Sequence, residues 1–225
     1  MSVDHSGCNS NQDINFRFTG FTISGRVLGV VGAESCPDIN GGPANVKVEL
    51  ISTNNDLTNA VFTSQGGSYR FTNITPGKYK LVTSHPLLTI VQRGSPEIKL
   101  GFGNLVVDDI FSVPGYDMVG LVVSQGNPVL GVHVYLYSDD VLEVICPRGP
   151  GAAPWPKQAL CYAISDANGK FTFKFIPCGK YKLLPFYKGE NTIFDVSPPS
   201  MEVLVEHIHV TISQPFQVSQ LEDVL

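Results

Sequence analysis

Two histidines and several carboxylates are the side chains that could bind a metal ion. His207 and His209 lie two residues apart in a segment that alternates like a β-strand, so both should lie on one face of a sheet. A zinc site needs at least one further ligand, and a solvated strand face is the simpler interpretation. The stretch Asp166-Ala-Asn-Gly169 begins like a calcium loop but lacks the later ligands and is typical of a turn. The other carboxylates weighed as calcium ligands are Asp108, Asp109, Asp139, Asp140 and Glu143, and the sequence predicts no metal or cofactor site.

The cysteines are candidates for disulfide bonds. None forms a Cys-x-x-Cys pair, which disfavours a structural zinc site. Cys146 and Cys161 bracket a proline-rich loop that cannot hold itself by backbone hydrogen bonds, so we predict a disulfide between them, with two free, partly buried thiols as the alternative. A bond that closes a loop of about 15 residues contributes about 3 kcal/mol on a chain-entropy estimate. A second pairing, Cys8 with Cys36, would leave Cys178 unpaired.

One glycosylation sequon is present, Asn73-Ile74-Thr75. Paired cysteines and a sequon together are typical of the secretory pathway. The N-terminus, however, has neither the basic region nor the apolar region of a signal peptide. We therefore expect a fragment of a longer secreted or membrane protein.

Three aromatic residues are candidates for carbohydrate contact. Trp155 is the only tryptophan and lies in the proline-rich loop, while Tyr135 and Tyr137 share a strand face with His133, opposite Val134. Aromatic rings bury a large apolar surface and keep a polar group at their edge, as a sugar-binding platform requires. The alternative is that the tyrosines cover the sheet or a neighbouring module.

Composition and motifs argue against several functional classes. The chain carries a net charge of −5 with 16% charged residues, which disfavours a nucleic-acid partner. It contains no run of 18 apolar residues that could span a bilayer. It also lacks the Gly-x-Ser-x-Gly, P-loop and His-Glu-x-x-His signatures, so we do not expect the chain to be an enzyme.

The fold is predicted by an internal repeat. The stretch from Ser64 to Leu81 matches the stretch from Ser165 to Leu183, with the paired glycines, aromatics and leucines offset by 102 positions. Gly67 thus matches Gly169, and each copy has the pattern of turn, alternating strand, tight turn and strand that is typical of a β-hairpin. The rest of each copy is rich in β-branched residues and in turn-forming Gly and Pro, which indicates a sandwich or barrel.

A second repeat, offset by 95 positions, marks where one module ends and the next begins. Residues 16–27 match residues 111–122, each reading as a closing strand, a glycine-containing hinge and an opening strand. The sequence therefore predicts an all-β chain of two tandem immunoglobulin/transthyretin-like β-sandwich modules with about seven strands each. The predicted boundaries are a flexible lead-in at 1–13, the closing strand of a preceding module at 14–19, module 1 at 20–113, module 2 at 114–218 and a divergent tail at 219–225.

These motifs resemble a known family. The pattern Gly-x-[Tyr/Phe]-x-Phe-x-x-Ile-x-x-Gly-Lys-Tyr-x-Leu resembles carboxypeptidase regulatory-like and Cna-B-type domains, which have a transthyretin-like, carbohydrate-binding-like fold. The segments Phe16–Val27, Gly101–Phe111, Val132–Val144 and Tyr187–Pro199 are similar to the nodal modulator family, and to its plant members in particular. The similarity extends from about Asp13 to Val218.

The resemblance implies a non-enzymatic scaffold in the lumen of the endoplasmic reticulum, formed by a large array of such sandwiches on a single-pass membrane protein. It implies association with nicalin and a small multipass partner, beside the translocon, in the biogenesis of multipass membrane proteins, and a link to Nodal signalling in animals. The family has no catalytic residues to carry over to this chain. The alternative function is that of a carbohydrate-binding module, which rests on analogy of fold.

Overall fold

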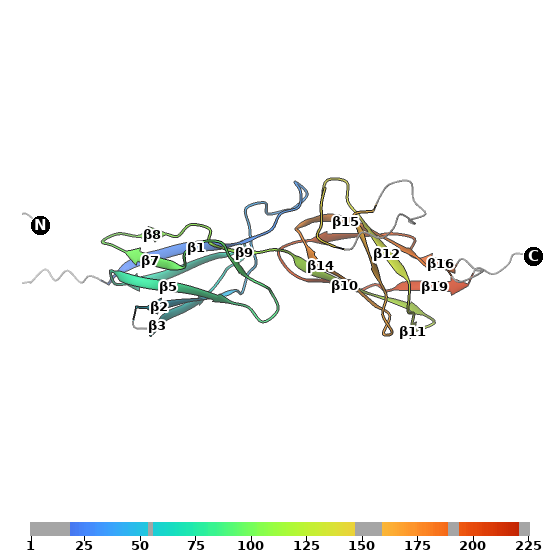
Figure 1. Cartoon of the computed structure of the whole chain (residues 1–225), viewed down its shortest axis with the longest axis horizontal. Helices are drawn as coiled ribbons and strands as arrows, with labels where there is room; N and C mark the ends of the chain where they lie inside the picture. Colours follow the sequence, from blue (N-terminus) through green and yellow to red (C-terminus); the bar gives the residue numbers. More distant parts are fainter. Residues whose placement is uncertain (1–18, 54–55, 147–158, 189–193, 221–225) are drawn as a thin grey trace, which may run out of the picture.

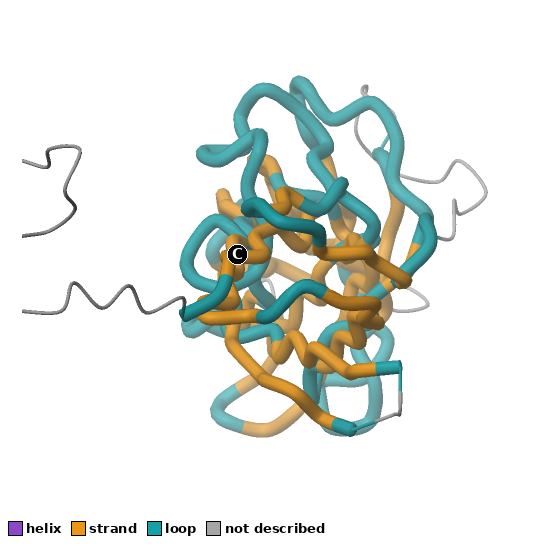
Figure 2. Tube along the Cα trace, turned by 90° about the vertical axis from the view of Figure 1, so that its left-hand side faces the viewer, coloured by secondary structure: helices purple, strands orange, loops and turns teal. Residues whose placement is uncertain are grey.

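The computed structural model describes residues 19–53, 56–146, 159–188 and 194–220. These residues form two β-sandwiches that lie end to end in an elongated molecule (Figure 1). Figure 2, which looks along the long axis, shows that the described residues form strands and loops. The predicted all-β fold of two tandem sandwiches is confirmed. Within the described residues, no helix is long and apolar enough to cross a membrane.

The first sandwich consists of two sheets. One has the order β4-β1-β9-β6, with β8 also paired to β1, and the other has the order β3-β2-β5-β7. The first of these contains β1 (Phe21–Gly29), β4 (Ser68–Ile74), β6 (Val91–Gln92), β8 (Leu105–Val106) and β9 (Phe111–Val113). The second contains β2 (Lys47–Ser52), β3 (Leu57–Phe62), β5 (Gly77–Ser84) and β7 (Glu97–Leu100).

The second sandwich repeats this arrangement. One sheet has the order β11-β10-β19-β16, with β14 and β18 also on β10, and the other has the order β13-β12-β15-β17. The first contains β10 (Tyr116–Ser124), β11 (Asn127–Pro128), β14 (Lys170–Ile176), β16 (Phe194–Ser197), β18 (Val210–Thr211) and β19 (Phe216–Gln220). The second contains β12 (His133–Tyr137), β13 (Cys161–Ile164), β15 (Gly179–Phe186) and β17 (Met201–Val205).

Alternation along the strands builds the core of each sandwich. In β14, Phe171, Phe173 and Ile176 are buried while Lys170 and Lys174 are exposed, as expected for a strand with one face in the core. The tight turn that follows brings Tyr181 into the core, where its hydroxyl donates a hydrogen bond to the Pro177 carbonyl at 2.9 Å. The two strands of each repeat copy nevertheless do not pair with each other, because β4 pairs with β1 and β5 with β2 and β7, while β14 pairs with β10 and β15 with β12 and β17. The predicted β-hairpin is therefore wrong, and the tight turn instead connects the two sheets of each sandwich.

The two sandwiches also share a β-bulge, which lies between β1 and β4 in the first and between β10 and β14 in the second. In the first sandwich Phe21 pairs with Ile74 but Ile23 pairs with Phe71, so one strand carries an extra residue. Strands β10 and β14 show the same shift between Tyr116 and Met118. The equivalent residues in the bulges, Asn73 and Phe175, have positive φ angles of 60° and 56°. Asparagine tolerates this left-handed conformation better than phenylalanine does.

The closing segments of both sandwiches differ from the continuous strands that alternation predicts. Each is broken into two short pieces that pair in parallel with the first strand of the sandwich, β8 and β9 with β1, and β18 and β19 with β10. Asp108 and Asp109 lie in the first break, and Ser213 and Gln214 in the second. Polar turn-forming residues override the apolar alternation at these points.

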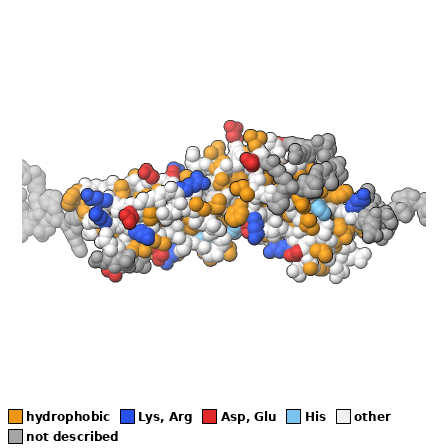
Figure 3. Space-filling view, in the orientation of Figure 1, with side chains coloured by type: hydrophobic (Ala, Val, Ile, Leu, Met, Phe, Trp, Pro, Cys, Tyr) orange, Lys and Arg blue, Asp and Glu red, His pale blue; other side chains and the backbone are white. Residues whose placement is uncertain are grey.

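Charged side chains of both signs are mixed over the surface. On the face shown in Figure 3, Lys and Arg lie among Asp and Glu over both sandwiches, and hydrophobic side chains gather over the middle of the molecule. The middle is where the two sandwiches meet, and the strongest cluster of functional candidates lies there.

Candidate functional site at the junction of the two sandwiches

A loop of the first sandwich reaches across to the second. Residues 30–46 join β1 to β2, and in Figure 1 the blue part of this loop extends toward the right-hand sandwich. The amide of Gly32 donates to the carbonyl of Cys178 at 2.9 Å, and the amide of Cys178 donates to the carbonyl of Val30 at 3.1 Å. Val31 and Cys178 form an isolated parallel bridge. The loop thus adds a short strand-like contact to the β14–β15 turn.

A disulfide bond between Cys36 and Cys178 makes this contact covalent. The two Cα atoms are 5.2 Å apart, and the residues are only 3% and 0% exposed. The suggested pairing of Cys8 with Cys36, with Cys178 left over, is therefore wrong. The partners are 142 positions apart and come from different sandwiches, so local spacing gives no signal of the pairing.

Hydrogen bonds beside the disulfide fix the same loop. The amide of Ser35 donates to Asp140 Oδ2 at 3.1 Å, and Ser35 Oγ accepts the amide proton of Lys180 at 2.9 Å. The hydrogen bond from the Ser35 side chain lowers the pKa of Asp140, helped by Ser138 and by backbone amides. These two hydrogen bonds, one through the amide of Ser35 and one through its side chain, hold the loop on the second sandwich.

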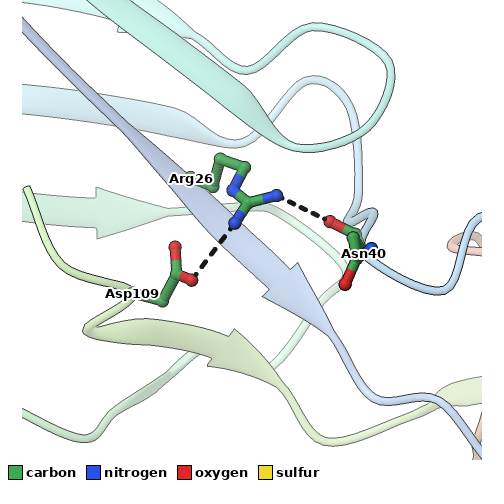
Figure 4. A network of polar contacts seen from close by, with 3 residues as sticks. All are labelled: Arg26, Asn40 and Asp109. Carbon is green, nitrogen blue, oxygen red and sulfur yellow. Dashed lines mark hydrogen bonds and ion pairs between the residues drawn. The ribbon is translucent and has the colours of Figure 1, made fainter. Parts of the chain in front are cut away.

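Arg26 anchors the same loop to its own sandwich. Its guanidinium donates to the Asn40 carbonyl at 3.2 Å and lies 3.4 Å from Asp109 Oδ2 (Figure 4). The side chains of Arg26 and Asp109 are 43% and 38% exposed, so this ion pair contributes at most about 1 kcal/mol. Its role is to position the loop between β1 and the segment before β9.

His207 lies in this junction and not on a solvated strand face. Residues 206–209 form a bend between β17 and β18, so the expected strand through both histidines is wrong. The His207 ring bridges the sandwiches, with Nε2 2.8 Å from the Asp38 carbonyl and Nδ1 3.0 Å from the Tyr116 hydroxyl. Burial raises the pKa of Tyr116 well above its usual range, so the hydroxyl keeps its proton and donates it to Nδ1.

Gly29 provides the space for this histidine. A Cβ atom at Gly29 would lie 2.0 Å from His207 Nδ1 and 2.5 Å from the Tyr116 hydroxyl oxygen. A side chain there would displace the His207 ring and the Tyr116 hydroxyl from their present contact. The sequence shows Gly29 only as part of a strand end, so its role at the junction could not be predicted.

His209 and His85 complete the junction. His209 Nδ1 accepts the amide proton of Asp117 at 2.6 Å, and its Nε2 is 3.3 Å from the Leu87 carbonyl of the first sandwich. His85 Nδ1 accepts the amide protons of Leu87 and Leu88 at 3.2 and 3.0 Å. Burial lowers the pKa of His85, and the nearby His209 lowers it further. The three histidines line a groove of about 760 Å³ between the sandwiches.

The donor set at the junction does not form a metal site in this state. The donor atoms of Cys36, Cys178 and His207 all lie within 4.8 Å of one another. Both sulfurs are used in the disulfide bond, however, and zinc binds the thiolate form of cysteine. The proximity of His207 Nε2 to Cys36 Sγ, 3.8 Å, therefore reflects packing around the disulfide.

The second disulfide joins Cys146 to Cys161, the pair that the proline-rich loop predicts. Its Cα atoms are 5.9 Å apart, and Cys161 begins β13. The bond closes the insertion between β12 and β13, and residues 147–158 of that insertion lie outside the described residues.

Replacing both Cys146 and Cys161 by serine is expected to lower the free energy of unfolding of the second sandwich by about 3 kcal/mol, because the open loop gains conformational freedom in the unfolded state. Urea denaturation followed by NMR signals of each sandwich measures this, and the first sandwich is the internal control. Alkylation of both thiols in the unreduced wild-type chain would contradict the pairing.

The two described candidates for carbohydrate contact, Tyr135 and Tyr137, differ in their exposure. Tyr135 lies on the outer face of its sheet, but Tyr137 is 7% exposed, so its proposed place on an exposed platform is wrong. The chain just after β12 buries Val141 and Val144, which shows that this end of the strand is packed. Trp155 lies outside the described residues.

Two other aromatic residues accompany Tyr135. The rings of His133 and Tyr162 lie 6.2 and 6.2 Å from Tyr135 and 5.6 Å from each other. Burial raises the pKa of Tyr135, and Tyr162 adds to the effect. Tyr162 was missed because it follows the proline-rich loop, and only the pairing of β13 with β12 brings it beside Tyr135.

Asn73 of the sequon is exposed at the bulge of β4. In an endoplasmic reticulum expression system, the wild-type chain is expected to carry one glycan at this position, because the side chain is accessible. Asn73→Gly keeps the positive φ and should abolish the glycan, whereas Thr75→Ser keeps the sequon and should retain it. Mass spectrometry with and without endoglycosidase decides this, and an unmodified wild-type chain would show that the bulge prevents transfer.

Comparison with known proteins gives consistent matches over both sandwiches. Residues 18–114 match a family described as BOS complex subunit NOMO1-like, second beta sandwich domain. Residues 118–219 match the NOMO third transthyretin-like domain.

Whole-protein relatives agree with these matches. The chain is 34% identical over 219 residues to the human BOS complex subunit NOMO3 and 35% identical over 220 residues to mouse NOMO1. A nematode relative, nicotinic receptor-associated protein 4 of Caenorhabditis elegans, is 23% identical over 205 residues. The matches cover 94%, 94% and 88% of this chain, which spans 17% of the length of each of these relatives.

Solved structures resemble the chain only distantly. The shaft pilin SpaA of Lactobacillus rhamnosus GG gives a TM-score of 0.37 at 10% identity, covering 92% of this chain and 100% of the pilin chain. The Bacillus anthracis TIE protein gives 0.38 at 14% identity, covering 89% of this chain and 34% of the other. These values are too low to support any argument about this chain.

Proposed function

The chain belongs to the NOMO family, and from this premise we propose that it is a non-enzymatic scaffold segment of a protein complex at the endoplasmic reticulum membrane. The human and mouse relatives are named as BOS complex subunits. This chain spans 17% of their length, so we propose that it contributes to the complex and do not assign it the role of the whole protein. The segment contributes two adjoining sandwiches to that assembly.

The observation that carries the proposal is the covalent junction. Cys36 and Cys178 join the two sandwiches, and the loop around Ser35 and the bend around His207 add polar contacts on both sides. A scaffold that holds its surfaces in fixed relative positions loses less conformational freedom when partners bind. A rigid pair of sandwiches supports a positioning role.

We assign the finer role by family resemblance. The segment would lie on the lumenal side of the membrane, contact nicalin-type partners and support translocon-associated biogenesis of membrane proteins. Two disulfides and an exposed sequon suit an oxidising lumen.

Co-purification tests this role. The chain, targeted to the endoplasmic reticulum with an added signal and tag, is expected to recover a nicalin-type subunit detected by immunoblot. The Cys36→Ser/Cys178→Ser variant should recover less, because its surfaces are no longer held together. A folded, glycosylated wild-type chain that recovers no subunit of the complex would contradict the proposal.

A second candidate function is carbohydrate binding, and the cluster of His133, Tyr135 and Tyr162 favours it. A glycan array would show saturable binding that Tyr135→Ala or Trp155→Ala abolishes. Glu49→Ala is the matched control, because Glu49 occupies the position of Tyr135 in the first sandwich, paired with Ala60 where Tyr135 pairs with Tyr162. Binding that survives Tyr135→Ala, or no binding at all, would remove this candidate.

A further inference from the structure

We propose that the junction is an acid-sensitive hinge, in which protonation of His209 and His85 loosens the contact between the sandwiches while the Cys36–Cys178 bond keeps them tethered. The proposal goes beyond the scaffold role. It rests on which ring nitrogen of each histidine accepts a hydrogen bond.

His209 fits the junction only as a neutral ring. Its Nδ1 accepts the Asp117 amide proton at 2.6 Å, so that nitrogen has no proton of its own. The remaining proton is on Nε2, which faces the Leu87 carbonyl of the first sandwich at 3.3 Å. A charged ring carries protons on both nitrogens, and a backbone amide cannot become an acceptor. Protonation therefore removes the Asp117 bond and displaces the ring from Leu87.

His85 responds to protonation in the same direction. Its Nδ1 accepts two amide protons, those of Leu87 and Leu88, which shape the loop that receives His209. Leu87 thus contacts one ring through its amide and the other through its carbonyl. Burial and the neighbouring His209 lower the pKa of His85. One loop of the first sandwich is consequently destabilised by the charging of either ring.

His207 tolerates protonation better. Its Nδ1 faces the Tyr116 hydroxyl at 3.0 Å, and a hydroxyl can rotate from donating to accepting a hydrogen bond. Its Nε2 proton, donated to the Asp38 carbonyl, is present in both charge states. The sensitive groups are therefore His209 and His85.

Two exposed carboxylates lie at the groove that the histidines line. Among the described residues that line the groove, the titratable side chains besides the three histidines are Asp38 and Glu206, and Asp117 adjoins it through its amide. Asp38 and Glu206 are exposed, so a charged imidazole that leaves its half-buried position can meet a carboxylate at the rim.

The sign of the pH effect follows. His85 has a folded-state pKa below its unfolded value of about 6.5, so the folded junction binds fewer protons than the open one. Its contribution is fully present above about pH 6.5 and is lost as the pH falls from there toward the lowered pKa. Acidification therefore weakens the junction.

The first sandwich contains a built-in control. The register of β1 with β8 and of β10 with β18 makes Asn104 the equivalent of His209. Asn104 Oδ1 accepts the amide proton of Thr22 at 2.9 Å, as His209 Nδ1 accepts that of Asp117. An amide oxygen does not titrate between pH 5 and 8, so only the second of these two equivalent bonds should depend on pH.

Hydrogen exchange of these two amides tests the proposal in the full chain. Between about pH 7.5 and about pH 5.5, the protection factor of the Asp117 amide is expected to fall, while that of Thr22 changes by less than about twofold. In the His209→Asn variant the Asp117 amide should behave like that of Thr22. Equal pH dependence of the two amides in the wild type, or an unchanged fall in His209→Asn, would overturn the proposal.

A second measurement needs no variant. Ring ¹⁵N shifts at about pH 7.5 should show His209 and His85 protonated at Nε2 and not at Nδ1. Residual dipolar couplings should fit one common alignment for both sandwiches at that pH and two different alignments at about pH 5.5. A common alignment at both pH values, with both rings charged at the lower one, would refute the hinge.

Discussion

Replacing Phe171 by alanine is expected to lower the free energy of unfolding of the second sandwich by about 4 kcal/mol. Phe171 is 1% exposed, and its ring lies 6.1 Å from that of Phe173 and 6.0 Å from that of Phe216. Because Phe216 belongs to the closing strand β19, the cavity would weaken the attachment of that strand. Urea denaturation followed by circular dichroism and by NMR signals of each sandwich measures the change.

The control on the same strand should change stability in the opposite direction. Phe175 is 40% exposed and has a φ of 56°, and the equivalent residue in the first sandwich is Asn73. Phe175→Asn should therefore raise the free energy of unfolding by up to about 1 kcal/mol, because asparagine tolerates the left-handed conformation. A loss comparable to that of Phe171→Ala would show that the bulge does not control this position.

Gly169→Ala is expected to cost the second sandwich about 4 kcal/mol. Gly169 has a φ of +70°, which costs about 1–2 kcal/mol for a residue with a Cβ. That Cβ would also lie 2.3 Å from the backbone oxygen of Val122, so the chain must move and break the 2.7 Å bond from the Val122 amide to the Gly169 carbonyl. A buried amide without a partner costs about 1–3 kcal/mol more.

Gly126→Ala separates these two causes. Gly126 has a φ of +83° but has no heavy atom within 4 Å of the position of its Cβ. Only the conformational cost remains, so about 1 kcal/mol is expected from the same denaturation experiment. Equal losses for the two variants would mean that the contact with Val122 contributes nothing.

The sequence predicts the strands of the two repeat copies and their burial because both depend on local patterns. It does not predict how these strands pair, because the partners of β14 and β15 lie elsewhere in the chain and in different sheets. The alternation of Phe171, Phe173 and Ile176 and the matched glycines of the two copies are short-range patterns, and the structure contains both. The sequence can also suggest the Cys146–Cys161 disulfide, because the two cysteines are separated by 15 positions and bracket one loop.

The junction could not be predicted because its partners are far apart in the chain. His207-Ile-His209-Val210 alternates like a strand, yet contacts with Asp38 and Leu87 of the first sandwich hold it as a bend. Cys36 meets Cys178 only because the loop after β1 crosses to the other sandwich. Tyr137 follows the strand period but is buried, since packing of the segment after β12 overrides exposure on that face.

The central claim is that the junction makes the two sandwiches one rigid body, and ¹⁵N relaxation of the unreduced chain at neutral pH tests it most directly. We predict that amides of both sandwiches fit a single rotational diffusion tensor elongated along the molecule. The relaxation data of the Cys36→Ser/Cys178→Ser variant should require two diffusion tensors, one for each sandwich. Two independent tensors in the wild-type chain, with the Cys36–Cys178 bond shown to be intact by mass spectrometry, would contradict the claim.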